Sequence, residues 1–232
     1  MPVDLVFETH SISEDNERGV ATGWLPGRLS ERGRALAAET LDGVRELARH
    51  RFLRRAMILT TVTNLMVNAL IMIFITGSAG LSPLEVGLVL AAGGVGGVLG
   101  STLTSGTEPG RAMLFTQMWI WVFALALPAL DAHPVLFGLA TLITGYTGAR
   151  NNVAVRAYEI RNVDRGKLGR VVSVHRLAVY GAVCLAAPLG GFLVAAFGVH
   201  DAAVKLFRTM LAIAVVVTVV RLLRRAAEAG HR

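Results

Sequence analysis

The chain has one cysteine, Cys184, among its 232 residues. A single thiol cannot form an intramolecular disulfide, and it gives no basis for a cysteine-based metal site. The sequence also lacks the ligand spacings of a metal site, a phosphate-binding loop and a dinucleotide-binding fingerprint. We therefore expect no catalytic residues, no metal, no cofactor and no enzyme activity.

Acidic residues are scarce after residue 55, where the sequence has seven Asp or Glu and fourteen Lys or Arg. Residues 1–55 hold nine residues of each sign. The apolar segments therefore contain no chain of acids and histidines of the kind that a dedicated proton relay uses. Residues 1–55 also lack an apolar run long enough for a signal peptide, so we expect the first membrane span to direct insertion.

Apolar residues are abundant: 53% of the chain is hydrophobic, and its mean hydropathy is +0.56. The 23 residues from Leu177 to Val199 carry no charge, and such a helix can cross a bilayer core of about 30 Å at about 1.5 Å per residue. Turn-forming residues separate further apolar runs. We predict an all-α membrane protein with a six-helix transmembrane bundle, its spans at residues 56–76, 84–104, 113–130, 135–155, 171–199 and 204–223.

The basic residues indicate the orientation of these spans. If the spans alternate, 21 of the 23 Lys and Arg residues lie on one side of the membrane. The positive-inside rule then places both termini in the cytoplasm of a multi-pass protein of the plasma (inner) membrane. It also explains the basic pI of about 10.7 without a nucleic-acid partner, so the partner we expect is the lipid bilayer.

Polar residues at membrane depth are the candidates for a substrate cavity. Asn64 and Asn68 are four residues apart and share one helical face, which should turn away from lipid. Gln117, Arg150 and Asn152 are further candidates for the substrate cavity, in later spans. Interhelical hydrogen bonding is the alternative for the amides, and an arginine that extends to the lipid headgroups is the alternative for Arg150.

Small residues in the second predicted span form two overlapping pairs, Gly93 with Gly97 and Gly96 with Gly100, which suit close helix packing within the bundle or, less simply, dimerisation. Pro188 predicts a kink in the fifth span, either a moving point or a fixed shape. Charged residues after the fourth span either form a cytoplasmic latch or are simply solvated: Glu159, Arg161, Asp164, Arg170 and Arg176.

The chain divides into an N-terminal segment at 1–40, a basic amphipathic linker helix at 41–55, the membrane domain at 56–225 and a tail at 226–232. We predict a strand, a loop and a helix in the N-terminal segment. Residues 3–38 resemble the opening of the histidine phosphatases, with His10 at the phosphate-accepting position, Asn16 at a loop asparagine and residues 29–33 at a helix start. Thr9 and Ser11 depart from that pattern, so we expect a cytoplasmic appendage without activity.

The membrane domain resembles the C-terminal half of major facilitator transporters of the efflux type. Asn152-Val153 and the run Gly169-Arg-Val-Val-Ser-Val-His-Arg176 carry the likeness, which covers about residues 41–225. The resemblance implies half of a major facilitator fold, built as two inverted three-span repeats, and export of a small organic substrate by alternating access. A second six-span bundle would be required, from a homodimer or a partner six-span chain.

Two other functions stay open at this point. The chain could be a truncated or fused membrane remnant that transports nothing. A membrane-tethered phosphohydrolase that uses His10 is the least favoured, because the further catalytic residues of that family are absent from the sequence.

Overall fold

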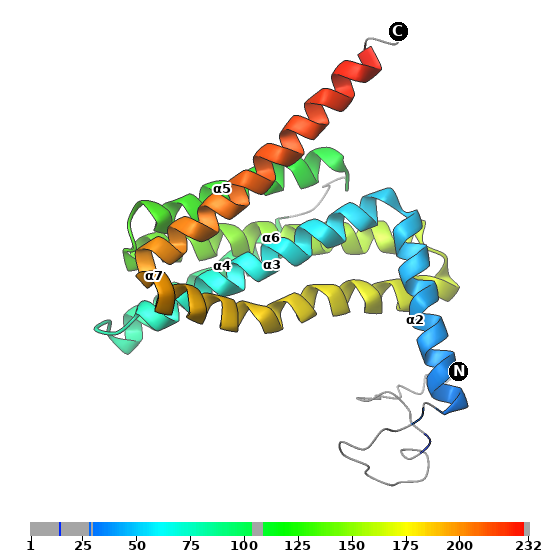
Figure 1. Cartoon of the computed structure of the whole chain (residues 1–232), viewed down its shortest axis with the longest axis horizontal. Coiled ribbons are helices and arrows are strands. Elements are labelled where there is room, and N and C mark those ends of the chain that lie inside the picture. Colours follow the sequence, from blue (N-terminus) through cyan, green and yellow to red (C-terminus); the bar gives the residue numbers. More distant parts are fainter. Residues whose placement is uncertain (1–13, 15–27, 29, 104–108, 230–232) are drawn as a thin grey trace.

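The computed structural model describes residues 14, 28, 30–103 and 109–229. Its elements in these ranges are six helices and no strand, which confirms the predicted all-α class. The predicted strand at residues 3–7, His10 and Asn16 lie outside the described residues. The helices are α2 (Glu31–Arg49), α3 (Arg51–Gly77), α4 (Pro83–Thr102), α5 (Arg111–Leu130), α6 (Pro134–Asn162) and α7 (Arg165–Ala229) (Figure 1).

Local hydrogen bonds fix where several helices begin. The Ser30 hydroxyl caps α2 by accepting the Gly33 N–H at 3.1 Å. At α4, Ser82 and Glu85 form a capping box, with Pro83 in the first turn, where its missing N–H costs nothing. The predicted linker helix at 41–55 is divided, because His50 is extended (φ −83°, ψ 100°) and separates α2 from α3.

Four helices are long and apolar enough to cross a membrane: α3, α4, α5 and α7. They indicate a multi-pass membrane protein. α6 is not among the four, because its second half carries the polar run Arg150, Asn151 and Asn152. α7 has 65 residues and leaves helical geometry at Gly198 (φ 78°, ψ 171°), a conformation that glycine adopts without strain. Its two arms, residues 165–197 and 199–229, therefore run in different directions (Figure 1).

The long helices pack around one another. α3, α7, α5 and α6 contact each other in turn and close a ring, while α4 packs mainly on α6. α2 leaves one end of this bundle and contacts α7 and α3 there. α3 and α4 are not among the helix pairs that pack extensively. A space can therefore open between them.

Glycines allow α4 to approach α6 closely. A Cβ at Gly96 would lie 2.1 Å from the Leu142 carbonyl oxygen, and one at Gly100 equally close to the Tyr146 carbonyl oxygen. A Cβ at Gly93 would be 3.6 Å from Thr141, and one at Gly97 would meet nothing within 4 Å. The Gly96 face of α4, rather than the Gly97 face, therefore holds this contact.

Pro188 does not break α7, whose non-helical residue is Gly198. The side chain of Pro188 is exposed. Two residues further on, a Cβ at Gly190 would come within 2.7 Å of the Ala69 carbonyl oxygen of α3. The absence of a side chain at Gly190 allows α7 to pack closely on α3.

The interior is apolar in two clusters. The larger one runs through the middle of the bundle and includes Leu70, Ile73, Leu125, Phe137 and Met210. The smaller one joins α2 to the ends of α3, α5, α6 and α7. Large apolar side chains also remain exposed along every candidate span, among them Ile58, Leu88, Phe123 and Val216. A surface of this kind suits lipid better than water.

Candidate functional site

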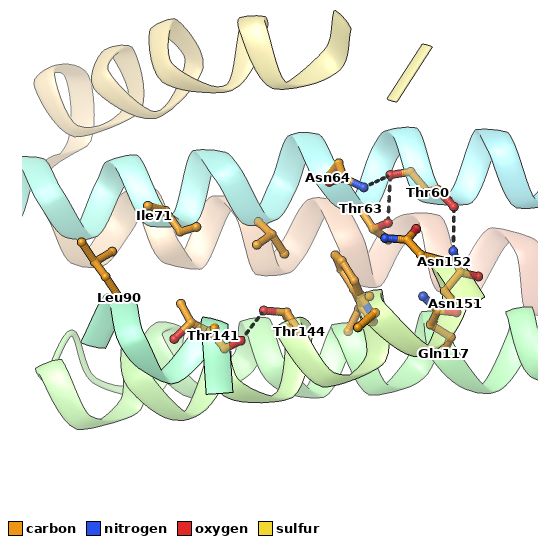
Figure 2. Close-up of a pocket in the computed structure, with 17 residues that line it drawn as sticks. Thr60, Thr63, Asn64, Ile71, Leu90, Gln117, Thr141, Thr144, Asn151 and Asn152 are labelled. Carbon is orange, nitrogen blue, oxygen red and sulfur yellow. Dashed lines mark hydrogen bonds between the residues drawn. The ribbon is translucent and has the colours of Figure 1, made fainter. Parts of the chain in front are cut away.

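A cavity of about 410 Å³ lies where α3 and α4 diverge, with α5 and α6 behind it. Figure 2 shows side chains of α3 facing those of α4 and α6 across this space. The polar lining is made of neutral groups only: Thr60, Thr63, Asn64, Gln117, Thr141, Thr144, Asn151 and Asn152. None of the lining residues is charged.

Thr60 organises the polar end of the cavity. Its hydroxyl accepts a hydrogen bond from the Asn151 amide of α6 at 2.9 Å. Its carbonyl accepts from the Asn64 amide at 2.9 Å and from the Thr63 hydroxyl at 3.1 Å (Figure 2). These bonds hold three polar side chains together and tie α3 to α6 at this point.

The opposite end of the cavity is mainly apolar, although Thr141 lies there beside Ile71 and Leu90. Val67 and Ile71 of α3 and Leu90 of α4 line it, and Ile71 and Leu90 lie at the far end from Asn151 in Figure 2. Eleven residues of helix separate Thr60 from Ile71, which corresponds to about 16 Å. Between the ends, the wall includes the glycines Gly93, Gly94, Gly145 and Gly148. The cavity is therefore amphipathic along its length.

Two buried polar atoms in the cavity lining have no hydrogen-bond partner. They are the Oδ1 of Asn151 and the Nε1 of Trp121, and the two side chains belong to residues that are 2% and 3% exposed. An unpaired buried polar group costs about 1–3 kcal/mol. One atom is an acceptor and the other a donor, and neighbouring protein atoms cover both of them.

Three of the predicted cavity residues line the cavity: Asn64, Gln117 and Asn152. Asn68 and Arg150 are not among the lining residues. The amide of Asn68 instead donates to the Asn64 carbonyl at 2.8 Å within its own helix. Arg150 is half-buried beside the cavity-lining residue Asn151, and its Nε is buried without a partner.

The sequence contained a signal for part of the lining that the prediction missed. Thr141, Thr144, Thr147 and Asn151 are buried on α6, and their spacing of three, three and four residues places them on one helical face. Trp121 lines the cavity, whereas Trp119 lines a separate, open hollow on α5 with Phe115 and Phe123.

Charged residues gather at the end of the bundle where α2 joins it. Glu159 is 2% exposed and bonds both Arg156 (3.0 Å) and the Nδ1 of His175 (2.9 Å), which connects α6 to α7. Lys167 of α7 contacts Glu46 of α2 at 3.0 Å. Arg170 contacts Glu39 of α2 at 3.1 Å.

The other predicted latch residues are placed differently. Arg161 and Arg176 are exposed. Asp164 accepts the Gly166 N–H at 3.0 Å, next to the start of α7. Only two residues separate α6 from α7, so the predicted loop is mostly helix. Of the five predicted latch residues, Glu159 and Arg170 join separate helices: Glu159 through its contact with His175 and Arg170 through its ion pair with Glu39.

The hydrogen bond from Lys167 lowers the pKa of Glu46 below its ordinary value of 4.5, with His50 and Arg49 adding to the effect. The carboxylate form of Glu46 therefore stabilises the contact of α2 with α7. Since this contact lies at the end of the bundle, it concerns the attachment of α2 and not the cavity.

The described residues include no group of three His, Cys, Asp or Glu side chains that could hold a metal ion. The neutral amides, hydroxyls and indole of the cavity can form hydrogen bonds and van der Waals contacts with a small molecule. Among known proteins, no family model matches the chain, and no curated sequence matches it.

Proposed function

We propose that the chain forms one six-span bundle of a major facilitator-like, efflux-type permease that moves a small organic compound by alternating access. The observation that carries the proposal is the neutral, polar cavity between α3, α4, α5 and α6. Asn64, in its lining, is the central residue of the 27-residue helix α3, so it falls near the middle of the bilayer if α3 crosses it. Secondary transporters bind substrates at this depth.

Six crossings follow if α6 and both arms of α7 cross the bilayer with α3, α4 and α5. α6 has 29 residues, about 43 Å of helix, and it packs against the candidate spans α4 and α5. Its buried polar face turns to the cavity and to Thr60 rather than to lipid. Each arm of α7 is also long enough to cross, and Gly198 provides the reversal between them.

The sequence resemblance supports the same function. Asn152, from the matching Asn-Val pair, lines the cavity. The matching run at residues 169–176 begins the first arm of α7, beside the ion pairs of Lys167 and Arg170. We assign this charged end to the cytoplasmic side of the inner membrane, because most Lys and Arg residues lie on that side of the predicted spans. A second six-span bundle, from another copy or another six-span segment, would close the cavity for transport.

Efflux of a neutral amphipathic dye, Nile red, from cells that express the protein tests this function. Asn64→Ala and Asn68→Ala form a matched pair. Both amides donate to a carbonyl one turn earlier on α3, at 2.9 Å and 2.8 Å, but only Asn64 lines the cavity. We expect Asn64→Ala to reduce efflux at least about fivefold, since a hydrogen bond contributes about 1 kcal/mol, while Asn68→Ala keeps it.

The same experiment separates the alternatives. A protein that inserts and folds but exports nothing would support the non-transporting remnant. Equal efflux by both variants would remove the cavity from the transport pathway and refute the proposal.

A further inference from the structure

We infer that the protein binds one anionic phospholipid on its membrane-facing surface, where α3, α5 and the second arm of α7 meet. Arg111 and Arg221 hold the phosphate, and one acyl chain lies in the open hollow on α5. The inference goes beyond the proposed function and does not depend on transport. Two observations carry it: arginines that have no acidic partner in the described part of the chain, and an aromatic hollow that begins beside one of them.

Arginines from three helices come close together at one end of the bundle. Arg55 of α3 is repelled by the charges of Arg111 of α5 and Arg224 of α7, and by two further arginines of its own helix. The three helices contact one another in pairs, and α3 and α5 begin toward the same end of the bundle in Figure 1. An anion bound among these arginines would offset their mutual repulsion.

The arginines on this side of the bundle differ from those beside α2. There, the basic residues Lys167 and Arg170 are paired with carboxylates of α2. By contrast, no ion pair within the described ranges includes the arginines near α5, which are Arg55, Arg111, Arg221 and Arg224. Their charge therefore attracts an anion from outside the chain.

Arg221 lies at one end of the hollow. Its guanidinium carbon is 4.4 Å from the centre of the Phe115 ring, and Phe115 is the first residue of the hollow along α5. A guanidinium that stacks on a ring still presents its N–H groups outward in its own plane. Arg111 is one turn before Phe115 on the same face of α5. Both arginines can therefore donate to one phosphate at this point, and such donors match phosphate oxygens in geometry.

The hollow is suited to an acyl chain. Its lining is Phe115, Thr116, Trp119, Ile120 and Phe123, whose spacing places them along one face of α5. From the first to the last of them the helix rises by about 12 Å, close to the depth of about 15 Å of one leaflet's hydrocarbon. This face is turned away from the substrate cavity, since the cavity residue Trp121 is two positions and about 200° from Trp119.

The two features together select the kind of lipid. A soluble anion would use the arginines and leave the hollow empty. A zwitterionic lipid such as phosphatidylcholine would use the hollow, but the arginines would repel its cationic group. A phospholipid with a net negative charge, such as phosphatidylglycerol, uses both.

Quenching of tryptophan fluorescence by brominated lipid tests the site. The protein has three tryptophans, so Trp24→Phe with Trp121→Phe leaves Trp119 as the only emitter. The purified protein is reconstituted in phosphatidylcholine with an increasing fraction of dibrominated phosphatidylglycerol or, separately, of dibrominated phosphatidylcholine. Comparison of the two quenching curves gives the affinity of the anionic lipid relative to the neutral one. A protein that keeps Trp121 alone is the control, because this residue is 3% exposed.

We expect Trp119 to show at least about a tenfold preference for phosphatidylglycerol, since each basic residue near the membrane surface contributes about fivefold to the attraction of an anionic lipid. Quenching of Trp121 should be weaker and without preference. Arg111→Gln and Arg221→Gln should each lower the preference at Trp119 about fivefold. The matched control is Arg176→Gln, which removes the same charge from an exposed position of α7 and should leave the preference unchanged. Circular dichroism shows whether each variant is folded.

Equal quenching of Trp119 by both lipids would overturn the inference. So would a preference that Arg176→Gln lowers as much as Arg111→Gln does, because it would come from the general basic charge of this end. Loss of the preference in millimolar glycerol 3-phosphate would assign the arginines to a soluble anion instead. Absence of quenching by either lipid would mean that another protein surface, such as a second copy, covers the hollow.

Discussion

The close approach of α4 to α6 predicts that one methyl group at Gly96 destabilises the protein. The Cβ of Gly96→Ala would lie 2.1 Å from the Leu142 carbonyl oxygen, against 3.4 Å where ordinary contact begins. Since the obstacle is backbone, the two helices must separate by about 1.3 Å at this point. A gap of 0.5–1 Å already forfeits about a quarter to a half of each dispersion contact.

The expected cost is about 1–3 kcal/mol, the usual range for overpacking. Gly97→Ala is the matched control, because its Cβ would meet nothing within 4 Å and alanine favours helix by up to about 1 kcal/mol over glycine. Because both variants gain this helix propensity, they should differ by the overpacking cost of about 1–3 kcal/mol, or at least about fivefold in the unfolding equilibrium.

Reversible unfolding of the purified protein in mixed micelles with increasing SDS measures this difference. Retained helicity of the native Gly96→Ala protein would show that the comparison concerns packing. If Gly96→Ala and Gly97→Ala unfold at the same SDS fraction, the argument from the α4–α6 contact is wrong.

Three further outcomes follow from the structure. The pKa of Glu46 is lowered in the folded protein, so the stabilisation from its contact with Lys167 is present above about pH 4.5 and is lost as the pH falls through the lowered pKa. Hydrogen exchange of the α2 amides should therefore accelerate in that pH window in the native protein. The Glu46→Gln variant should not show this change. Glu159→Gln should lower the free energy of unfolding in SDS by about 2 kcal/mol, because it removes a buried charge that binds Arg156 and His175 while Arg156 stays partly solvated. The control Asp164→Asn keeps an acceptor for the Gly166 N–H and should lower it by less than about 0.5 kcal/mol. Native mass measurement in nanodiscs should show two six-span bundles in one particle, such as a dimer of the 24.7 kDa chain, and a folded monomer alone would contradict the need for a second bundle.

The sequence was sufficient for the helical class and for most helix positions, because uncharged runs and turn residues act locally. The ends of α4 and α5 agree with the predicted spans within two residues. The break at His50 was not predictable in the same way, because it has no glycine or proline signal. α6 was predicted from its apolar first half, and its polar second half extends beyond the predicted span to Asn162.

The cavity was predictable only in part. Asn64, Gln117 and Asn152 stood out as polar residues in apolar runs, but whether such a residue faces a cavity depends on how the helices pack. Asn68 is one turn from Asn64 and yet lies outside the cavity lining, whereas Val67 and Ile71 on either side of it belong to the lining. A helix turns by about 100° per residue, so the face through positions 60, 64, 67 and 71 leaves position 68 to one side. The threonine face of α6 was visible as a spacing, whereas the unpaired atoms of Asn151 and Trp121 required the structure.

Chemical labelling of a cysteine at position 64 tests the central claim most directly. In a Cys184→Ser background, Asn64→Cys and Asn68→Cys are treated with a charged, membrane-impermeant methanethiosulfonate reagent from each side of sealed vesicles. A substrate cavity with alternating access predicts that Cys at position 64 reacts from both sides and that Cys at position 68 reacts far more slowly. A position 64 that is unreactive from both sides, or that reacts no faster than position 68, would contradict the account.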